Sequence, residues 1–182
     1  MPDQATLSDI QTLRSRARQH IEEGAVTDNY GADKNTVLRL LNEALATEIV
    51  CMLRYKRHYF SAKGLASISV AQEFLEHAQQ EEQHADMLAE RISQLGGEPD
   101  FSPHGLAERS HAEYIEGDTI VDMIKEDLVA ERIAIESYRE IAQYLGTADP
   151  TTRRLFEEIL AVEEEHADDL LRLIQQIGAG TA

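Results

Sequence analysis

Several residue types on which other classes of protein depend are scarce in this chain. One cysteine among 182 residues cannot form a disulfide within the chain, and it excludes a four-cysteine iron module. The chain opens on no charged-then-apolar signal segment, and no apolar run approaches the ~20 residues of a membrane span. These absences predict a cytoplasmic protein, kept in a reducing compartment and without a membrane partner.

Positive charge is scarce as well. The chain has 17 Lys and Arg residues against 34 Asp and Glu residues, so its formal net charge is −17. Such an acidic chain repels phosphate backbones and anionic membrane surfaces and attracts cations. We therefore expect cations, and not nucleic acid, as its partners.

Helix-breaking and aromatic residues are few. The chain holds four prolines, and aromatic residues make up 5% of it, whereas Ala, Leu, Glu and Gln are abundant. This composition favours helix almost throughout the chain. A length of 182 residues fits a single domain whose core needs no disulfide or metal to fold.

The spacing of apolar residues divides the chain into helices. It predicts a short leading helix over 7–23, with Thr6 or Ser8 as its cap. Four long helices are expected over about 33–62, 67–95, 118–145 and 150–178, the last one closed by Gly178. The stretch 96–117 contains two prolines and four glycines, which predicts a long crossover whose Ala-rich middle can form a helical turn.

The lengths of the connections predict the topology. Short loops join the helices within each pair, and the long crossover joins the pairs, so each pair is expected to form an antiparallel hairpin. We therefore expect an all-α protein with a four-helix bundle over 36–178. Residues 1–35 are expected to be an N-terminal extension that contains the short helix.

The two hairpins carry the same polar motif. EEQHADML at 81–88 returns as EEEHADDL at 163–170. A further glutamate precedes each motif at nearly the same distance, because Glu48 lies 33 residues before Glu81 and Glu131 lies 32 before Glu163. This repeat predicts a bundle with pseudo-twofold symmetry and one site built from two halves.

The acids of this repeat fall on the apolar stripes of their helices. Glu131, for example, lies between Leu128 and Ile135 at helical spacing, so its side chain is expected to point into the core. Burying unpaired carboxylates costs several kcal/mol each, and bound cations remove that penalty. Four glutamates and two histidines of the repeat lie on these stripes, namely Glu48, Glu81, His84, Glu131, Glu163 and His166.

These residue types define the expected metal. Each histidine follows its glutamate by three positions, which places both side chains on one face of a helix. Carboxylate oxygens with imidazole nitrogens suit two ferrous or manganous ions better than metals that prefer thiolate. One Glu from each of two helices and Glu-x-x-His from each of the other two is the arrangement of di-iron carboxylate bundles.

With these motifs the sequence resembles the ferritin-like superfamily, and within it bacterioferritin, over about residues 36–178. LLNEALATEIVCMLRY, EEQHAD, EDLVAER and EEEHADDL are similar to the motifs of the four bundle helices. The resemblance implies a ferritin-like four-helix bundle with two iron ions per subunit, for which Mn or Zn can substitute. It makes Glu48 and His84 ligands of one ion, Glu131 and His166 ligands of the other, and Glu81 and Glu163 bridges. It also implies a catalytic centre formed by these six residues, with Tyr55 beside it.

Three departures from bacterioferritin change what the resemblance implies. Glu82 stands where that family has its haem-binding Met, so no haem is expected. Only sixteen residues follow His166, which leaves no room for a fifth helix and favours a homo-oligomeric shell of 12 Dps-like subunits over one of 24. The first 35 residues have no counterpart, and a docking helix at a subunit contact is expected there.

The implied function is iron storage and detoxification. The protein is expected to be a ferroxidase that oxidises Fe2+ with O2 or H2O2 and keeps ferric mineral inside the shell. One alternative is a di-metal enzyme that stores nothing, such as a rubrerythrin-like peroxidase, which the single Cys disfavours, or a manganese catalase. The other is a DNA-protecting shell that uses Arg14, Arg16 and Arg18 of the leading helix.

Smaller signals surround these six residues. Tyr55 lies two turns after Glu48 and can hydrogen-bond a ligand or serve as a buried core tyrosine. Asp127 is expected to be a partly exposed acid, although it can also support Glu131. His58 and His77 can form a transient iron site, but surface or core-edge roles are expected for them.

Overall fold

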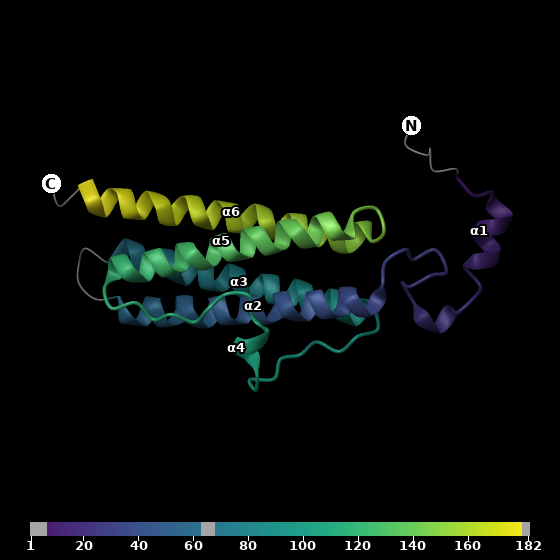
Figure 1. The fold of residues 1–182 in the computed structure, drawn as a ribbon, viewed down its shortest axis with the longest axis horizontal. Helices are drawn as coiled ribbons and strands as arrows, with labels where there is room; N and C mark the ends of the chain where they lie inside the picture. Colours follow the sequence, from purple (N-terminus) through teal and green to yellow (C-terminus); the bar gives the residue numbers. More distant parts are fainter. Residues whose placement is uncertain (1–6, 63–67, 180–182) are drawn as a thin grey trace.

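The computed structural model describes residues 7–62 and 68–179, and over these residues the chain is helical without strands. Four long helices form a bundle (Figure 1), namely α2 Lys34–Ser61, α3 Ile68–Gln94, α5 Ile120–Leu145 and α6 Pro150–Ala179. The short elements are α1 Ile10–Arg16, a 3₁₀ turn Ile21–Glu23 and α4 Leu106–Arg109. The predicted all-α bundle of two helical hairpins is confirmed. None of the described helices is long and apolar enough to cross a bilayer.

Capping residues set the helix boundaries close to the predicted ones. The Asp33 carboxylate accepts from the Thr36 N–H at the start of α2, and Thr119 forms a capping box with Asp122 at the start of α5. Gly178 does not close the last helix as predicted, because α6 runs on to Ala179. The predicted cap Thr6 and the start of the 67–95 helix lie outside the described residues.

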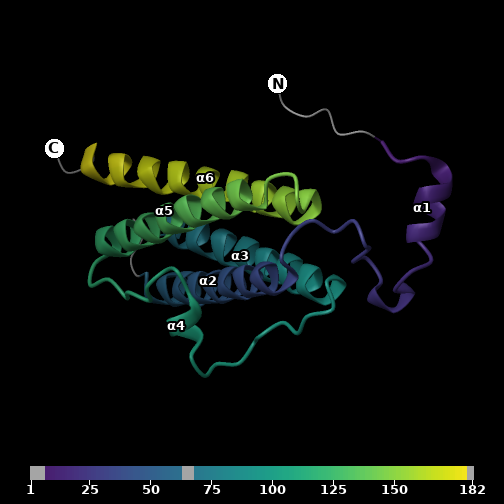
Figure 2. The ribbon, with the colours of Figure 1, turned by 45° about the vertical axis from the view of Figure 1, so that its right-hand side comes forward.

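The leading helix is shorter than the predicted 7–23. Its cap is Asp9 and not Ser8, because the Asp9 carboxylate accepts from the backbone N–H groups of Gln11 and Thr12. The helix ends early, and His20 has a left-handed backbone with φ 48°. No residue of α1 is buried, and the helix stands away from the bundle in both views (Figures 1 and 2). An isolated helix this short is only marginally stable in water, so without packing against the bundle the helix does not extend further.

The two hairpins pack with a polar layer between two apolar ones. α2 lies along α3 and α5 along α6, and the chain from α3 to α5 runs the length of the bundle (Figure 1). One apolar cluster includes Leu41, Leu88 and Phe156. A second cluster includes Phe74 and Leu170. The buried polar residues of the repeated motif fall between these clusters, at mid-length of the helices.

The crossover is fixed to α2 along its length. Hydrogen bonds join Asp100 to Asn42, His111 to Thr47, Glu113 to Arg54 and Glu116 to His58. The predicted helical turn in this segment is α4. At the end of the crossover, Gly117 has φ 65°, and an added Cβ would lie 2.8 Å from the Met123 nitrogen, so only glycine fits there.

Candidate metal centre

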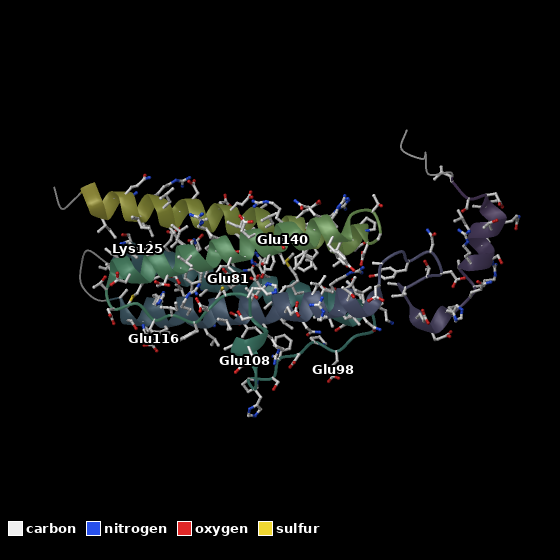
Figure 3. All side chains as sticks on the ribbon, in the orientation of Figure 1. Glu81, Glu98, Glu108, Glu116, Lys125 and Glu140 are labelled. Atoms are coloured by element: carbon white, nitrogen blue, oxygen red, sulfur yellow. The ribbon has the colours of Figure 1, made fainter. Side chains whose placement is uncertain are left out.

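The six residues predicted as ligands all lie in the buried polar layer. Their exposed fractions run from 1% to 5%. α2 contributes Glu48, α3 contributes Glu81 and His84, α5 contributes Glu131, and α6 contributes Glu163 and His166. Figure 3 shows Glu81 among the four helices, whereas Glu98, Glu108 and Glu116 lie along the crossover outside them. Each helix thus presents one acid to the same interior point.

The ligand atoms fall into two groups of four with two shared members. Glu48, Glu81, His84 and Glu163 offer atoms within 4.8 Å of one another, and so do Glu81, Glu131, Glu163 and His166. Glu81 and Glu163 belong to both groups. This is the arrangement expected of two adjacent ions that share two bridging carboxylates.

The two imidazoles face the carboxylates through the same ring nitrogen. His84 Nδ1 lies 2.9 Å from Glu163 Oε1 and 3.2 Å from Glu48 Oε2. His166 Nδ1 lies 3.3 Å from Glu163 Oε2 and 3.4 Å from Glu81 Oε1. His84 Nδ1 also lies 3.7 Å from Glu81 Oε2, and His166 Nδ1 lies 3.8 Å from Glu131 Oε1. Each Nδ1 thus faces all three carboxylates of its own group.

Buried atoms without hydrogen-bond partners show that the site fits cations. Among the described residues, Glu81 Oε1, Glu131 Oε2, both carboxylate oxygens of Glu163 and His166 Nδ1 are buried and unpartnered. Orphaned buried acceptors are rare in folded proteins because each one loses its hydration. Hard oxygen and nitrogen donors that converge in this way satisfy their lone pairs by binding a divalent cation.

The proton affinities of the site reflect the same crowding. Burial and the neighbouring charge of Glu81 raise the pKa of Glu48 to about 8. Burial, with the charges of Glu81 and Glu163, raises the pKa of Glu131 well above its ordinary value. Burial opposes protonation of His166, but the Glu163 and Glu81 carboxylates outweigh it and raise its pKa to about 9. Protons therefore compete with cations for these ligands.

Two tyrosines hold the terminal glutamates in a crossed pattern. The hydroxyl of Tyr55 on α2 donates to Glu131 Oε1 on α5, and the hydroxyl of Tyr138 on α5 donates to Glu48 Oε1 on α2. Tyr55 was singled out from the sequence, but Tyr138 was missed as a site residue. The repeat contains the signal, because each tyrosine follows its own helix's glutamate by seven residues.

Gln80 is a second residue that sequence reasoning missed. Its Oε1 lies 2.9 Å from His166 Nε2, so Nε2 carries the hydrogen of the neutral ring and Nδ1 keeps its lone pair for a metal. The corresponding position before Glu163 is Val162, so the repeat itself gave no indication of this contact.

The sequence-based expectations for Asp127 and His58 were wrong. Asp127, expected to be partly exposed, is fully buried and accepts from Arg54 Nε at 2.8 Å. His58, expected at the surface or core edge, is buried as well, with its ring nitrogens 2.8 Å from Asp127 and 2.9 Å from the Glu116 carbonyl. Because both nitrogens of His58 are in use, this histidine cannot serve as a transient iron ligand.

His77 is also buried, with 2% exposed, and it lies against the centre. Its ring stacks on that of His166 with centroids 4.0 Å apart, and its Nδ1 lies 3.2 Å from the Tyr55 hydroxyl. Burial lowers the pKa of His77 to about 3, so this ring is neutral at physiological pH. The expected core-edge role is therefore wrong for His77, which belongs to the surroundings of the metal centre.

Comparisons with known proteins show to which family this helical bundle is similar. A family model described as a ferritin-like domain matches residues 38–179. A nutrient stress-induced DNA-binding protein of Synechococcus sp. is 35% identical over 131 residues, which cover 70% of this chain and 74% of that protein.

Solved structures agree with the family model. The dodecameric thioferritin of Bacteroides fragilis, a bacterioferritin-related protein, aligns with a TM-score of 0.79 at 31% identity, over 83% of this chain and 91% of that one. A bacterioferritin of Desulfovibrio desulfuricans, described by its diiron site, aligns with a TM-score of 0.71 at 26% identity, over 80% and 82% of the two chains. The fold and the buried carboxylate layer thus define a ferritin-like helical bundle protein. The chain belongs to the ferritin-like domain family, with proteins named bacterioferritin and DNA protection during starvation protein among its relatives.

Proposed function

We propose that this protein is a ferroxidase of an iron-storing shell, which oxidises Fe2+ with O2 or H2O2 and keeps the ferric product inside a homo-oligomer. The observation that carries the proposal is the pair of four-ligand groups that share Glu81 and Glu163. Two ferrous ions held side by side can supply two electrons to one oxidant molecule together.

The residues of the site each have a task in this proposal. Glu48 with His84, and Glu131 with His166, would hold one ion each, and Glu81 and Glu163 would hold both. Tyr55 and Tyr138 fix the orientation of the terminal glutamates through their hydrogen bonds. The apolar clusters on either side of the polar layer keep bulk water away from the ligands.

The storing shell is the second half of the proposal. A dodecamer is described for the Bacteroides fragilis relative, and twelve chains of 20.4 kDa would total about 245 kDa. The net charge of −17 per chain would attract Fe2+ to such an assembly. Aerobic loading with a large excess of Fe2+, followed by size-exclusion chromatography with iron and protein measured in each fraction, tests both halves.

The outcomes of this experiment separate the candidate functions. Iron that co-elutes with a large assembly, far beyond two ions per chain, supports storage. Iron that stops near two per chain, or protein that elutes as a dimer, would make the protein a non-storing di-metal enzyme. Release of O2 from H2O2 by the Mn-loaded protein would then identify a manganese catalase.

DNA binding is the second candidate, favoured by the name of the Synechococcus relative and by the arm that carries Arg14 and Arg16. The net charge opposes it. A gel shift with linear duplex DNA at about 20 and 200 mM salt tests it, because a phosphate-contacting arm binds at the lower salt and releases at the higher.

A further inference from the structure

A second, smaller cluster of possible ligands lies beside the metal centre. Glu73 and His77 on α3 and Asp169 on α6 offer ligand atoms within 4.8 Å of one another. The side chains of Glu73 and Asp169 are 32% and 31% exposed, whereas His77 is buried. The cluster therefore reaches from the surface of the α3–α6 pair to a ring that stacks on His166.

The hydrogen bonds around His77 decide which of its nitrogens is free. The Tyr55 hydroxyl gives its hydrogen to Glu131, so toward His77 it can only accept, and Nδ1 of His77 must carry the ring's hydrogen. Nε2 then holds a lone pair, and a carboxylate oxygen of Glu73 lies 3.6 Å from it. A lone pair that faces a carboxylate is unfavourable unless a cation or a proton lies between them.

The pseudo-symmetry of the bundle supplies an internal comparison. Counting from the repeated motif, the places of Glu73 and His77 on α3 correspond to Leu155 and Ile159 on α6, and the place of Asp169 corresponds to Met87. Ile159 is a buried member of one apolar core cluster, and Leu155 and Met87 are partly buried and pack against that cluster.

The fold can thus close this position with apolar side chains, as it does in the other half. Polar side chains that can bind a metal occupy this position only in the half that contains Glu73, His77 and Asp169. Packing requirements alone do not explain Glu73, His77 and Asp169, because an apolar set satisfies the same packing.

We propose that Glu73, His77 and Asp169 form a third metal-binding site, at which a divalent cation pauses between the surface and the dinuclear centre. This inference rests on the proposed function, since it supplies the centre with its substrate Fe2+. Two carboxylates and one imidazole suit Fe2+ or Mn2+, and a site with two partly exposed ligands releases its ion more readily than the enclosed centre. The stacked rings of His77 and His166 make the two sites neighbours.

Anomalous scattering from crystals of the full-length protein soaked anaerobically in Mn2+ tests the site. We expect two peaks at the centre and a third between Glu73, His77 and Asp169. In the variant E73Q/D169N the third peak should disappear and the two central peaks should remain, which also shows that the variant folds. The matched control D86N/E165Q removes two exposed carboxylates from the same two helices and should keep all three peaks.

The role in delivery has its own readout. At Fe2+ concentrations well below saturation, E73Q/D169N should oxidise iron about tenfold more slowly than the control, with the same maximal rate at saturation. Two central peaks without a third in the unaltered protein would overturn the inference, and so would equal rates of both variants at low Fe2+. A third peak without central ones would support the site and instead contradict the proposed ferroxidase.

Discussion

At the residue scale, the buried glutamates of this bundle are chemically unusual. A carboxylate in an apolar interior keeps its charge only beside a compensating cation, and otherwise takes up a proton. Glu131 shows the second case, because burial and two neighbouring carboxylates raise its pKa well above the ordinary value. The site therefore exchanges protons for metal ions, and this exchange leads to three predictions.

The variant E131Q imitates the protonated form of Glu131. Its amide can still accept from Tyr55, so the melting temperature of the metal-free protein should change by no more than about 3 °C. Metal binding at one of the two positions should be lost, because the amide cannot supply the negative charge. At about 100 times the dissociation constant, Mn2+ should stabilise the unaltered protein by about 2.7 kcal/mol, and E131Q by clearly less.

Differential scanning fluorimetry with and without Mn2+ measures both effects. E140Q, which alters an exposed glutamate of the same helix, is the control and should behave as the unaltered protein. Full Mn2+ stabilisation of E131Q would show that Glu131 is not a ligand.

Metal affinity should rise with pH. Glu48, with a pKa of about 8, and His166, with a pKa of about 9, must lose their protons before they can bind a cation. Mn2+ affinity should therefore increase from pH 6.5 to 9, with protons released on binding. Calorimetry in two buffers of different ionisation enthalpy counts those protons, and a pH-independent affinity would contradict the proposed ligands.

The stability of the metal-free protein should move in the opposite direction. The raised pKa of His166 stabilises the fold fully below its ordinary value of 6.5, and this contribution is lost as pH rises through about 9. The raised pKa of Glu48 acts in the same sense between 4.5 and about 8, because the folded state binds the extra proton there. Urea unfolding of metal-free protein at pH 6.5 and 9 measures this difference.

At the scale of the elements, α2 is tied to α5 and to the crossover by a buried network. Asp127 accepts from Arg54, and Arg54 also donates to the Glu113 carbonyl at 2.8 Å. The variant D127A would leave a buried guanidinium without its counter-ion, which should lower the free energy of unfolding by about 3–5 kcal/mol. Urea denaturation measures this loss, with D118A at an exposed aspartate as the control. A cost below about 1 kcal/mol would show that water or another acceptor replaces Asp127.

The long helices and the central layer could be predicted from the sequence because each leaves a periodic signal. Apolar spacing and caps such as Thr119 gave the boundaries, and the interruption of four apolar stripes by Glu48 and its counterparts indicated the site. The repeat was used for the ligands but not for Tyr138, although the same seven-residue interval applies there.

Other features had no signal of this kind. The burial of Asp127, His58 and His77 depends on which polar partners the neighbouring helices and the crossover present. Gln80 reaches His166 across two helices, a contact between residues 86 positions apart. The apolar spacing of 7–23 predicts a longer helix than α1 because such spacing normally reflects packing, and no residue of α1 is buried against the described bundle.

At the scale of the whole molecule, the N-terminal arm is the part that the bundle does not explain. Leu7 and Ile10 are 93% and 60% exposed, and α1 stands off the bundle (Figure 2). We propose that this helix docks on a second subunit, which would cover the exposed apolar residues.

Deletion of residues 1–24 should therefore leave the helices of the bundle and the metal centre unchanged but reduce the number of subunits in the assembly. The deletion stops before Tyr30, which donates to Asp149 of the bundle at 2.8 Å. Light scattering after size-exclusion chromatography gives the mass, and an assembly with an unchanged number of subunits would contradict a docking role for the arm.

The most direct test of the dinuclear centre is rapid mixing of the protein with increasing Fe2+ in oxygenated buffer, with the absorbance of ferric iron followed over time. Two ions held by shared glutamates predict a fast phase whose amplitude grows up to two Fe2+ per chain and then stops growing, and E131Q should lack it. A fast phase that saturates at one Fe2+ per chain, or oxidation no faster than in buffer alone, would contradict a di-iron ferroxidase.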